Sequence, residues 1–104
     1  MAKLVVMYSA PKDAAAFDKH YFETHIPIAK AIPGLRKYEV NNGPIMTPAG
    51  PSAFHLIATL HFDDVAAIQN AFASPQGQAA AADVQGMGFP EGGVQMLIMD
   101  AREV

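Results

Sequence analysis

The stretch AFHLIATLHF, residues 53–62, decides the fold because its side chains alternate between an apolar set and a mixed set. An alternation of period two is typical of a β-strand that is buried on one face. The apolar set, which we expect to face the core, is Phe54, Leu56, Ala58, Leu60 and Phe62. The mixed set on the other face is His55, Ile57, Thr59 and His61.

Upstream of this stretch, the sequence predicts a strand, a helix and a second strand. Residues 2–9 are rich in Leu, Val and Met and run into turn residues at 9–13, as a strand end does. Asp13 can cap the start of a helix. Pro27 should kink or restart this helix, and Pro33-Gly34 should end it. Residues 35–41 form the second strand, and residues 42–51 a mobile loop. The apolar stripe of the helix is Ala14, Phe17, Tyr21, Ile28 and Ile32.

Downstream, the sequence predicts two helices and a last strand. Asp63 or Asp64 can cap the first helix. Ser74 and Pro75 look like the cap and first position of a shorter helix that extends to Ala82. A Gly-rich loop at residues 86–93 leads into a strand at 94–101. The apolar positions of the first of these helices are Val65, Ile68 and Phe72.

The element order β-α-β-β-α-β predicts an α+β fold of the ferredoxin-like type, in which an antiparallel sheet carries both helices on one face. We expect residues 1–104 to form this single domain. Three of the four predicted strands have apolar residues on both faces, which a sheet covered on one side does not need. The sequence therefore predicts a homodimer through the bare sheet face.

The composition disfavours several classes of function. The formal net charge of -3, with only 16% charged residues, disfavours nucleic-acid binding, because phosphates call for clustered Lys and Arg. The absence of cysteine excludes disulfides, thiolate metal sites and a cysteine nucleophile. No apolar run approaches the roughly 20 residues of a membrane span, and no signal peptide precedes the first strand. We therefore expect a cytoplasmic protein that binds neither nucleic acid nor membranes.

The four histidines are the first candidates for acid–base chemistry, because they titrate near neutral pH without perturbation. His25 lies on the helix stripe with Tyr21, just before the helix-breaking proline. It either ties down the kink or acts on a ligand as acid or base. His55 and His61 share a strand face but lie about 20 Å apart, so one metal ion cannot bind both. His20 falls off the stripe, on a face predicted to be solvated.

Tyrosines and carboxylates complete the candidate site. Tyr21 and Tyr38 can each present a ring with a hydroxyl tip to a pocket or to the core edge. Asp83 and Asp100 can each orient a histidine or serve as turn residues. No phosphate loop, zinc-protease motif or hydrolase elbow is present, and we expect neither a cofactor nor a metal ion. We predict His25, Tyr38 and His61 as catalytic residues and Tyr21, His55, Thr59 and Asp83 as ligand-binding residues.

Two segments of the chain resemble the EthD family of dimeric α+β barrel proteins. The first is FDKHYFETHIP at residues 17–27 with IPGL at 32–35, and the second runs from SPQGQ at 74–78 to ADV at 82–84. The resemblance implies a cavity between sheet and helices and a sheet that joins that of a second copy. It assigns the family's helix histidine and the following proline to His25 and Pro27. The loop QGMGF at residues 85–89 departs from the family pattern, so we expect the lid over the pocket to differ.

The resemblance also implies small-molecule metabolism. The family is named after a protein encoded beside an ether-degrading monooxygenase system, and its relatives include cofactor-free isomerases, cyclases and monooxygenases. Our first hypothesis is a cofactor-free isomerase, cyclase or oxidoreductase that acts on a small apolar or aromatic compound, with His25 as acid or base. The alternative is a binding module or oxygenase accessory protein that holds a hydrophobic ligand. A third is a dimeric structural domain with a vestigial pocket. One fold hosts many functions, so the geometry of the site must decide.

Overall fold

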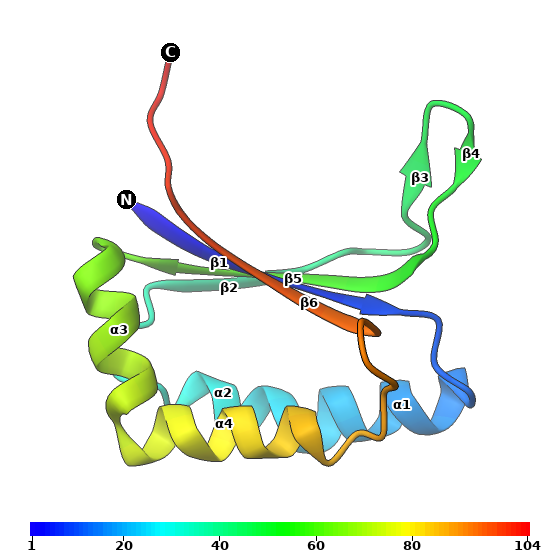
Figure 1. Cartoon of the computed structure of the whole chain (residues 1–104), viewed down its shortest axis with the longest axis horizontal. Coiled ribbons are helices and arrows are strands. Elements are labelled where there is room, and N and C mark those ends of the chain that lie inside the picture. Colours follow the sequence, from blue (N-terminus) through cyan, green and yellow to red (C-terminus); the bar gives the residue numbers. More distant parts are fainter.

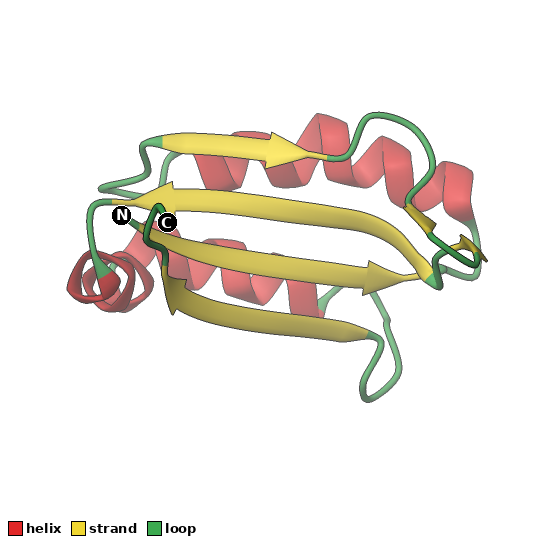
Figure 2. Ribbon diagram, turned by 90° about the horizontal axis from the view of Figure 1, so that it is seen from above, coloured by secondary structure: helices red, strands yellow, loops and turns green.

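A four-stranded antiparallel sheet carries the α-helices on one of its faces (Figure 1). The computed structural model describes all 104 residues. The strands lie in the order β2-β5-β1-β6, which Figure 2 shows from above. This order, with helices between the strands, confirms the predicted ferredoxin-like fold. The strands of the sheet are β1 (Ala2–Ser9), β2 (Lys37–Val40), β5 (Phe54–Phe62) and β6 (Val94–Asp100).

The central strands β1 and β5 build the core. They pair in antiparallel register, with Leu4 opposite Leu60. Every second side chain of these strands is buried beneath the helices, as the period of two requires. The predicted core face of residues 53–62 is confirmed from Leu56 onward. The buried side chains are Ala2, Leu4, Val6 and Tyr8 in β1 and Leu56, Ala58, Leu60 and Phe62 in β5.

The first helical segment contains a π-helical turn in its middle. The segment consists of α1 (Ala14–His20), the π-helix η1 (Tyr21–His25) and α2 (Ile26–Lys30). Asp13 caps the start by accepting a hydrogen bond of 3.0 Å from the backbone N–H of Ala16. In a regular α-helix, a proline ring clashes with the carbonyl four residues earlier. The wide turn before Pro27 relieves this clash, so the predicted irregularity takes the form of a π turn.

The second helical segment consists of α3 (Val65–Ala73) and α4 (Pro75–Gln85). Asp64 caps α3, whereas Asp63 forms an ion pair with an arginine, and this decides between the two predicted caps. Ser74 caps α4 as predicted. This helix continues past the predicted end at Ala82, because the next helix-breaking residue is Gly86. No helix of the protein is long and apolar enough to cross a membrane.

The segment that follows the first helix differs from the prediction in two details. The predicted strand at residues 35–41 is shorter, because the N–H of Leu35 still closes a turn onto the Ile32 carbonyl. The predicted loop at residues 42–51 contains a short hairpin of β3 (Met46–Thr47) and β4 (Gly50–Pro51). In this hairpin the Thr47 hydroxyl donates to the Gly50 carbonyl at 2.8 Å. A side-chain bond of this kind leaves no trace in the Pro- and Gly-rich composition that predicted irregular backbone.

A bulge at the start of β5 overturns the predicted orientation of His55. The pairing register with β1 slips between residues 8 and 9, so His55 is an extra residue in β5. Alternation placed its side chain on the bare face of the sheet. In the structure the imidazole contacts the first helix instead. Its ring centroid lies 5.5 Å from that of Phe17, and its Nε2 atom lies 2.7 Å from Oδ1 of Asp18.

The second face of the sheet is bare, and the edge strand β6 exposes apolar side chains. No helix lies against this face (Figure 1). Most of β6 is exposed on both of its faces. An exposed apolar row on an edge strand is a surface where another chain can bind. The large apolar side chains that β6 exposes are Met96, Leu97, Ile98 and Met99.

We expect Gly77→Ala to destabilise the fold, because α3 and α4 approach each other closely at Gly77. A Cβ atom at residue 77 would lie 2.0 Å from the Ala71 carbonyl oxygen and 2.8 Å from the Cα atom of Phe72. Backbone atoms cannot yield as a flexible side chain can. The expected loss is about 3 kcal/mol in the free energy of unfolding, measured by urea denaturation.

Gly86→Ala is the matched control at the other end of α4. A Cβ atom there would lie at an ordinary contact distance of 3.5 Å from the Asp83 carbonyl oxygen. We expect the urea midpoint of this variant to stay close to that of the wild type. Equal midpoints for the two variants would contradict a rigid close approach at Gly77.

Candidate functional site

A small apolar cavity, here called the inner cavity, lies between the sheet and the helices. Its volume is about 90 Å³, and 14 of its 15 lining residues are hydrophobic. The resemblance to the EthD family implied a cavity in this place. The lining residues that carry polar atoms at their tips are Tyr8, Tyr21, Tyr38 and His25.

His25, which lines the inner cavity, belongs to a cluster of two histidines and one aspartate. The Nδ1 atom of His25 lies 2.8 Å from Oδ2 of Asp83, and Nε2 of His20 lies 3.0 Å from each carboxylate oxygen. The first helical segment supplies both histidines, and α4 supplies the carboxylate. His25 is 5% exposed, whereas His20 is partly exposed, so the cluster runs from the interior to the surface. No group of three or more His, Asp or Glu side chains is arranged to hold a metal ion.

The π turn explains why both histidines reach one carboxylate. Along a regular α-helix, five residues turn through about 500°, which leaves their side chains about 140° apart. In η1 the backbone N–H of Ile26 bonds to the carbonyl of Tyr21, five residues earlier, so the turn holds one more residue. This extra residue brings His25 round to the side of His20. The regular period had placed His20 on a solvated face.

Burial and hydrogen bonding fix the protons of this cluster. Burial acts to raise the pKa of Asp83, but its hydrogen bonds with His25 and His20 outweigh burial and hold this pKa below its ordinary value. An ionised carboxylate only accepts hydrogen bonds, so Nδ1 of His25 and Nε2 of His20 each carry a proton. Burial lowers the pKa of His25, although its bond to Asp83 acts the other way. At pH 7, His25 is therefore neutral with a lone pair on Nε2.

Tyr21 and Tyr38 form a hydroxyl pair beside His25. Their oxygen atoms lie 2.6 Å apart, and the ring centroids of Tyr21 and His25 are 5.0 Å apart. Burial raises the pKa of both phenols, so they stay protonated and can donate hydrogen bonds. Burial also raises the pKa of Tyr8, which lines the same cavity. A neutral base and phenol donors thus meet at one apolar space.

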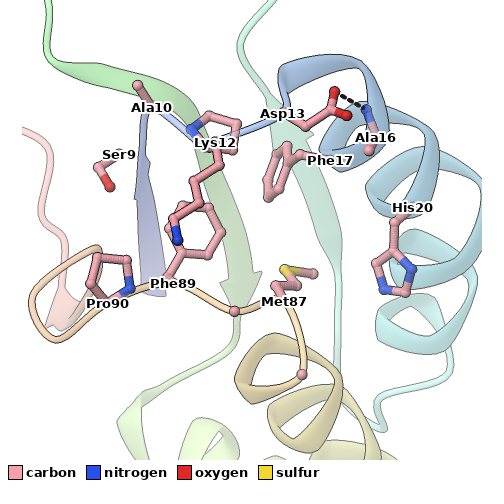
Figure 3. Close-up of a pocket in the computed structure, with 13 residues that line it drawn as sticks. Ser9, Ala10, Lys12, Asp13, Ala16, Phe17, His20, Met87, Phe89 and Pro90 are labelled. Atoms are coloured by element: carbon pink, nitrogen blue, oxygen red, sulfur yellow. Dashed lines mark hydrogen bonds between the residues drawn. The ribbon is translucent and has the colours of Figure 1, made fainter.

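A second space, here called the outer pocket, is larger than the inner cavity. Figure 3 shows the side chains that line it. Its volume is about 430 Å³, and it lies between the end of β1, the start of α1 and the Gly-rich loop. The rings of Phe17, Phe89 and Tyr8 pack with centroids 5.4 to 5.7 Å apart. Phe17 and Phe89 line the outer pocket, whereas Tyr8 lines the inner cavity. This aromatic cluster therefore separates the two spaces.

Four of the seven side chains predicted for the site lie together, since three line the inner cavity and the fourth, Asp83, bonds to one of these three. They do so because the sheet face and the helical stripe that carry them pack on each other, and because Asp83 follows on the neighbouring helix. Their functional roles stay predictions. The four are His25, Tyr38, Tyr21 and Asp83.

The other three predicted residues lie elsewhere. Thr59 and His61 lie on the face of β5 opposite its core residues, and His61 is only 8% exposed there. His61 bonds there to Glu39, with 2.7 Å between Nε2 and Oε1, and does not share a site with His25. His55 lies at the bulge and lines a separate pocket of about 480 Å³. Asp100 is exposed near the end of β6.

Two residues of the site were not predicted. His20 was assigned to solvent, although its spacing of five from His25, just before Pro27, is the spacing that a π turn aligns. Tyr8 was assigned only to the first strand. Tyr8 is separated from Leu4 and Val6 by an even number of residues, so all three side chains lie on the helix-covered face of the strand. This spacing could have identified Tyr8 from the sequence.

We expect ¹⁵N-resolved NMR titration to show His25 neutral at pH 7 with its proton on Nδ1. Burial lowers the pKa of His25 and the Asp83 carboxylate raises it. Asp83→Asn removes that carboxylate, so the pKa of His25 should fall further in this variant. Because the folded pKa lies below the unfolded value, the unfolded chain takes up this proton first as the pH falls. His25 should therefore reduce stability as the pH drops below about 6.5, until the folded pKa is passed.

Asp18→Asn is the control for this titration, since that carboxylate contacts His55 and not His25. It should leave the His25 signals unchanged. A proton on Nε2 of His25, or a pKa at or above the ordinary value, would contradict the assigned proton positions.

Comparison with known proteins gives a family for this chain. A family model described as EthD domain matches residues 10–88. A curated relative from Rhodococcus erythropolis, described as an uncharacterized 11.0 kDa protein in the thcB-thcC intergenic region, is 40% identical over 104 residues. The match covers 100% of this chain and 98% of the relative. The similarity therefore extends over both whole sequences.

Several solved structures are similar to this chain, among them the following two. The crystal structure of an ethyl tert-butyl ether degradation (EthD) family protein from Bacillus halodurans has a TM-score of 0.87 at 34% identity, over 98% of this chain and 99% of that one. SnoaB, a cofactor-independent oxygenase from Streptomyces nogalater, has a TM-score of 0.68 at 14% identity, over 99% and 94%. The second likeness shows the fold alone. With the family match and the two closer similarities together, the chain belongs to the EthD domain family.

Proposed function

We propose that this protein is an enzyme that moves protons on a small apolar or aromatic molecule, with His25 as the acid–base residue and no cofactor. One observation carries the proposal. His25 is buried, one ring nitrogen is held by Asp83, and the ring borders an apolar cavity. A buried titratable group that is oriented by a second group and faces a cavity is the usual arrangement of a general base.

The geometry suits isomerisation of a carbonyl compound or rearrangement of a lactone. Nε2 of His25 accepts a proton from the carbon that lies between the carbonyl and a C=C bond of an unsaturated compound. The electron pair of that C–H bond forms a new C=C bond to the carbonyl carbon, and the π pair of the carbonyl moves to its oxygen. A phenol of the Tyr21 and Tyr38 pair donates a hydrogen bond to this oxygen as it becomes negative. His25 then returns the proton to the far carbon of the original C=C bond, and the electron pair on oxygen re-forms the carbonyl, so the double bond has shifted and no external acid or oxidant is consumed.

Asp83 acts here as a positioning residue. Its carboxylate keeps the His25 proton on Nδ1, which leaves Nε2 as the basic atom, and it stabilises the imidazolium that forms in the first step. General acid–base catalysis by one well-placed group typically contributes about 10²- to 10⁴-fold in rate. The proposal therefore requires a single base rather than a larger catalytic assembly.

The family and the structural neighbours support small-molecule metabolism. The neighbour SnoaB is described as a cofactor-independent oxygenase, which supports oxygen insertion as a variant of the same base chemistry. Such a reaction would begin with the same proton abstraction by His25 and would consume O₂. An oxygen electrode distinguishes it from isomerisation.

We expect the wild-type protein to exchange a carbon-bound proton of an unsaturated lactone, aryl ketone or hydroxyaromatic acid for deuterium in D₂O, followed by ¹H NMR. His25→Gln should slow this exchange about 10²- to 10⁴-fold, because it removes the base. Glu23→Gln is the matched control on the same turn. Glu23 is exposed and pairs only with Lys19, so the exchange rate should not change.

The variant His61→Gln tests on which face of the sheet the exchange reaction takes place. Retained exchange in this variant would agree with chemistry in the inner cavity, where His61 does not lie. Loss of exchange in His61→Gln with full activity in His25→Gln would contradict the proposal and move the chemistry to the bare face.

The alternative is a binding module that holds a hydrophobic ligand for an oxygenase partner. The observation that favours it is the almost wholly apolar lining of the inner cavity, which a carrier needs as much as an enzyme does. Saturable binding of the lactone, ketone or hydroxyaromatic acid without deuterium exchange would favour the binding module over the enzyme.

We further propose that the protein forms a homodimer through its bare sheet face and β6. The exposed apolar side chains of β6 support this arrangement, since a second copy can cover them. Leu97→Asp places a charge on this face, so we expect it to convert a dimer of twice the chain mass to a monomer in light scattering. Met46→Asp, on the exposed hairpin, is the control and should stay dimeric. A monomeric wild type would contradict the proposal.

A further inference from the structure

The two spaces at the site differ in what they can hold. Ligand pockets of proteins usually have volumes of roughly 300–1,000 Å³. The outer pocket, at about 430 Å³, falls in this range, whereas the inner cavity, at about 90 Å³, falls below it. The outer pocket is therefore large enough for a whole small molecule, whereas the inner cavity is not.

We propose that the outer pocket is the binding site for a hydroxylated aromatic compound. The ring of this compound lies against Phe17, Met87 and Phe89, and the hydroxyl group of the compound donates a hydrogen bond to His20. This inference rests on the proposed function and names the class of compound that the site takes.

The walls of the outer pocket suit an aromatic ring. Phe17 and Phe89 meet edge to face, with centroids 5.6 Å apart and an angle of 88° between their planes, so each ring offers an edge or a face to a third ring. Figure 3 shows Met87 on the adjacent wall. A thioether makes favourable contacts with aromatic rings and adapts to their shape. These three side chains come from α1 and from the loop after α4.

The polar groups of the pocket favour a hydroxyl over a carboxylate. Lys12 and Asp13 both line it, so their opposite charges offset each other. The Asp13 carboxylate is engaged as the helix cap. His20 has its Nε2–H committed to Asp83, and in the neutral ring this leaves Nδ1 as an acceptor for an O–H donor. The same carboxylate holds His25, so the bound hydroxyl would lie two hydrogen bonds from the proposed base.

Phe89 lies in a loop, whereas the other two members of the aromatic cluster lie in regular elements, Tyr8 in β1 and Phe17 in α1. Gly88 and Gly92 flank it with φ angles of 78° each, a conformation that other residues rarely adopt. The Gly93 N–H bonds to the Pro90 carbonyl at 2.9 Å and closes the turn. The loop thus holds the Phe89 ring between the two spaces, where a ligand ring in the outer pocket would contact it.

The test uses the full chain labelled with ¹³C in its methionine methyl groups and titrated with 2-naphthol. Met87 lines the outer pocket and Met46 lies on the exposed hairpin, so their signals distinguish binding in the pocket from binding at the surface. We expect a saturable shift of the Met87 signal and none of Met46. Absence of a Met87 shift, or a larger shift at Met46, would overturn the proposed site.

Two pairs of measurements test the contacts. Phe89→Ala should weaken 2-naphthol binding about 10-fold, whereas Phe22→Ala, an exposed aromatic residue of the same first helical segment outside the pocket, should leave it unchanged. Wild type should bind 2-naphthol about 2- to 10-fold more tightly than naphthalene, the worth of one hydrogen bond. His20→Phe should abolish this preference and keep naphthalene binding. Equal affinities in wild type, or a preference that survives in His20→Phe, would overturn the assignment of His20.

The two proposals fail separately. Deuterium exchange that depends on His25, together with no Met87 shift, would reject the outer-pocket site and keep the base chemistry. A Met87 shift that depends on Phe89, with no exchange in any compound, would keep the binding site and reject the chemistry.

Discussion

The carboxylate of Asp83 is the interaction on which the site depends. It is ionised and partly buried, and a charge that is partly removed from water must be paired or it destabilises the fold. His20 and His25 provide the pairing from the first helical segment, so α4 has to lie beside that segment with its residue 83 facing it. The space that remains between these helices and the sheet is the inner cavity. One hydrogen-bonded cluster therefore relates the two helical segments and places the proposed base at the cavity wall.

The irregular π turn is what makes the cluster possible. A regular helix would send His20 and His25 in different directions, and Asp83 could then satisfy only one of them. π turns occur often at functional sites, because they re-aim a side chain without breaking the helix. In this protein the turn precedes Pro27, whose missing N–H and bulky ring disfavour a regular turn at that point. A helix-breaking residue and a functional arrangement thus have the same structural origin.

The two faces of the sheet have different roles in this arrangement. The helix-covered face holds the tyrosines, the base and the aromatic cluster that separates the two spaces. The bare face holds His61, Thr59 and a surface that suits a second copy. The EthD fold by itself does not decide the chemistry, since one fold can carry several activities. The chemistry depends on the neutral His25, the protonated phenols and the pocket beside them.

Local rules acting on the sequence determined most of the fold. Apolar composition and the turn residues that follow predicted the strand at residues 2–9, and alternation predicted the strand at 53–62. Asp13 and Ser74 predicted two helix starts, and the order of elements predicted the sheet. Each of these features depends on near neighbours along the chain. Tertiary structure alone decided the bulge that turns His55, the separation of His61 from His25, and the recruitment of His20. A register slip depends on the partner strand, and His20 lies 63 residues from Asp83, so no local pattern could report their contact. What joins distant residues at this site is the requirement to pair a buried charge, and that requirement exists only once the helices have packed.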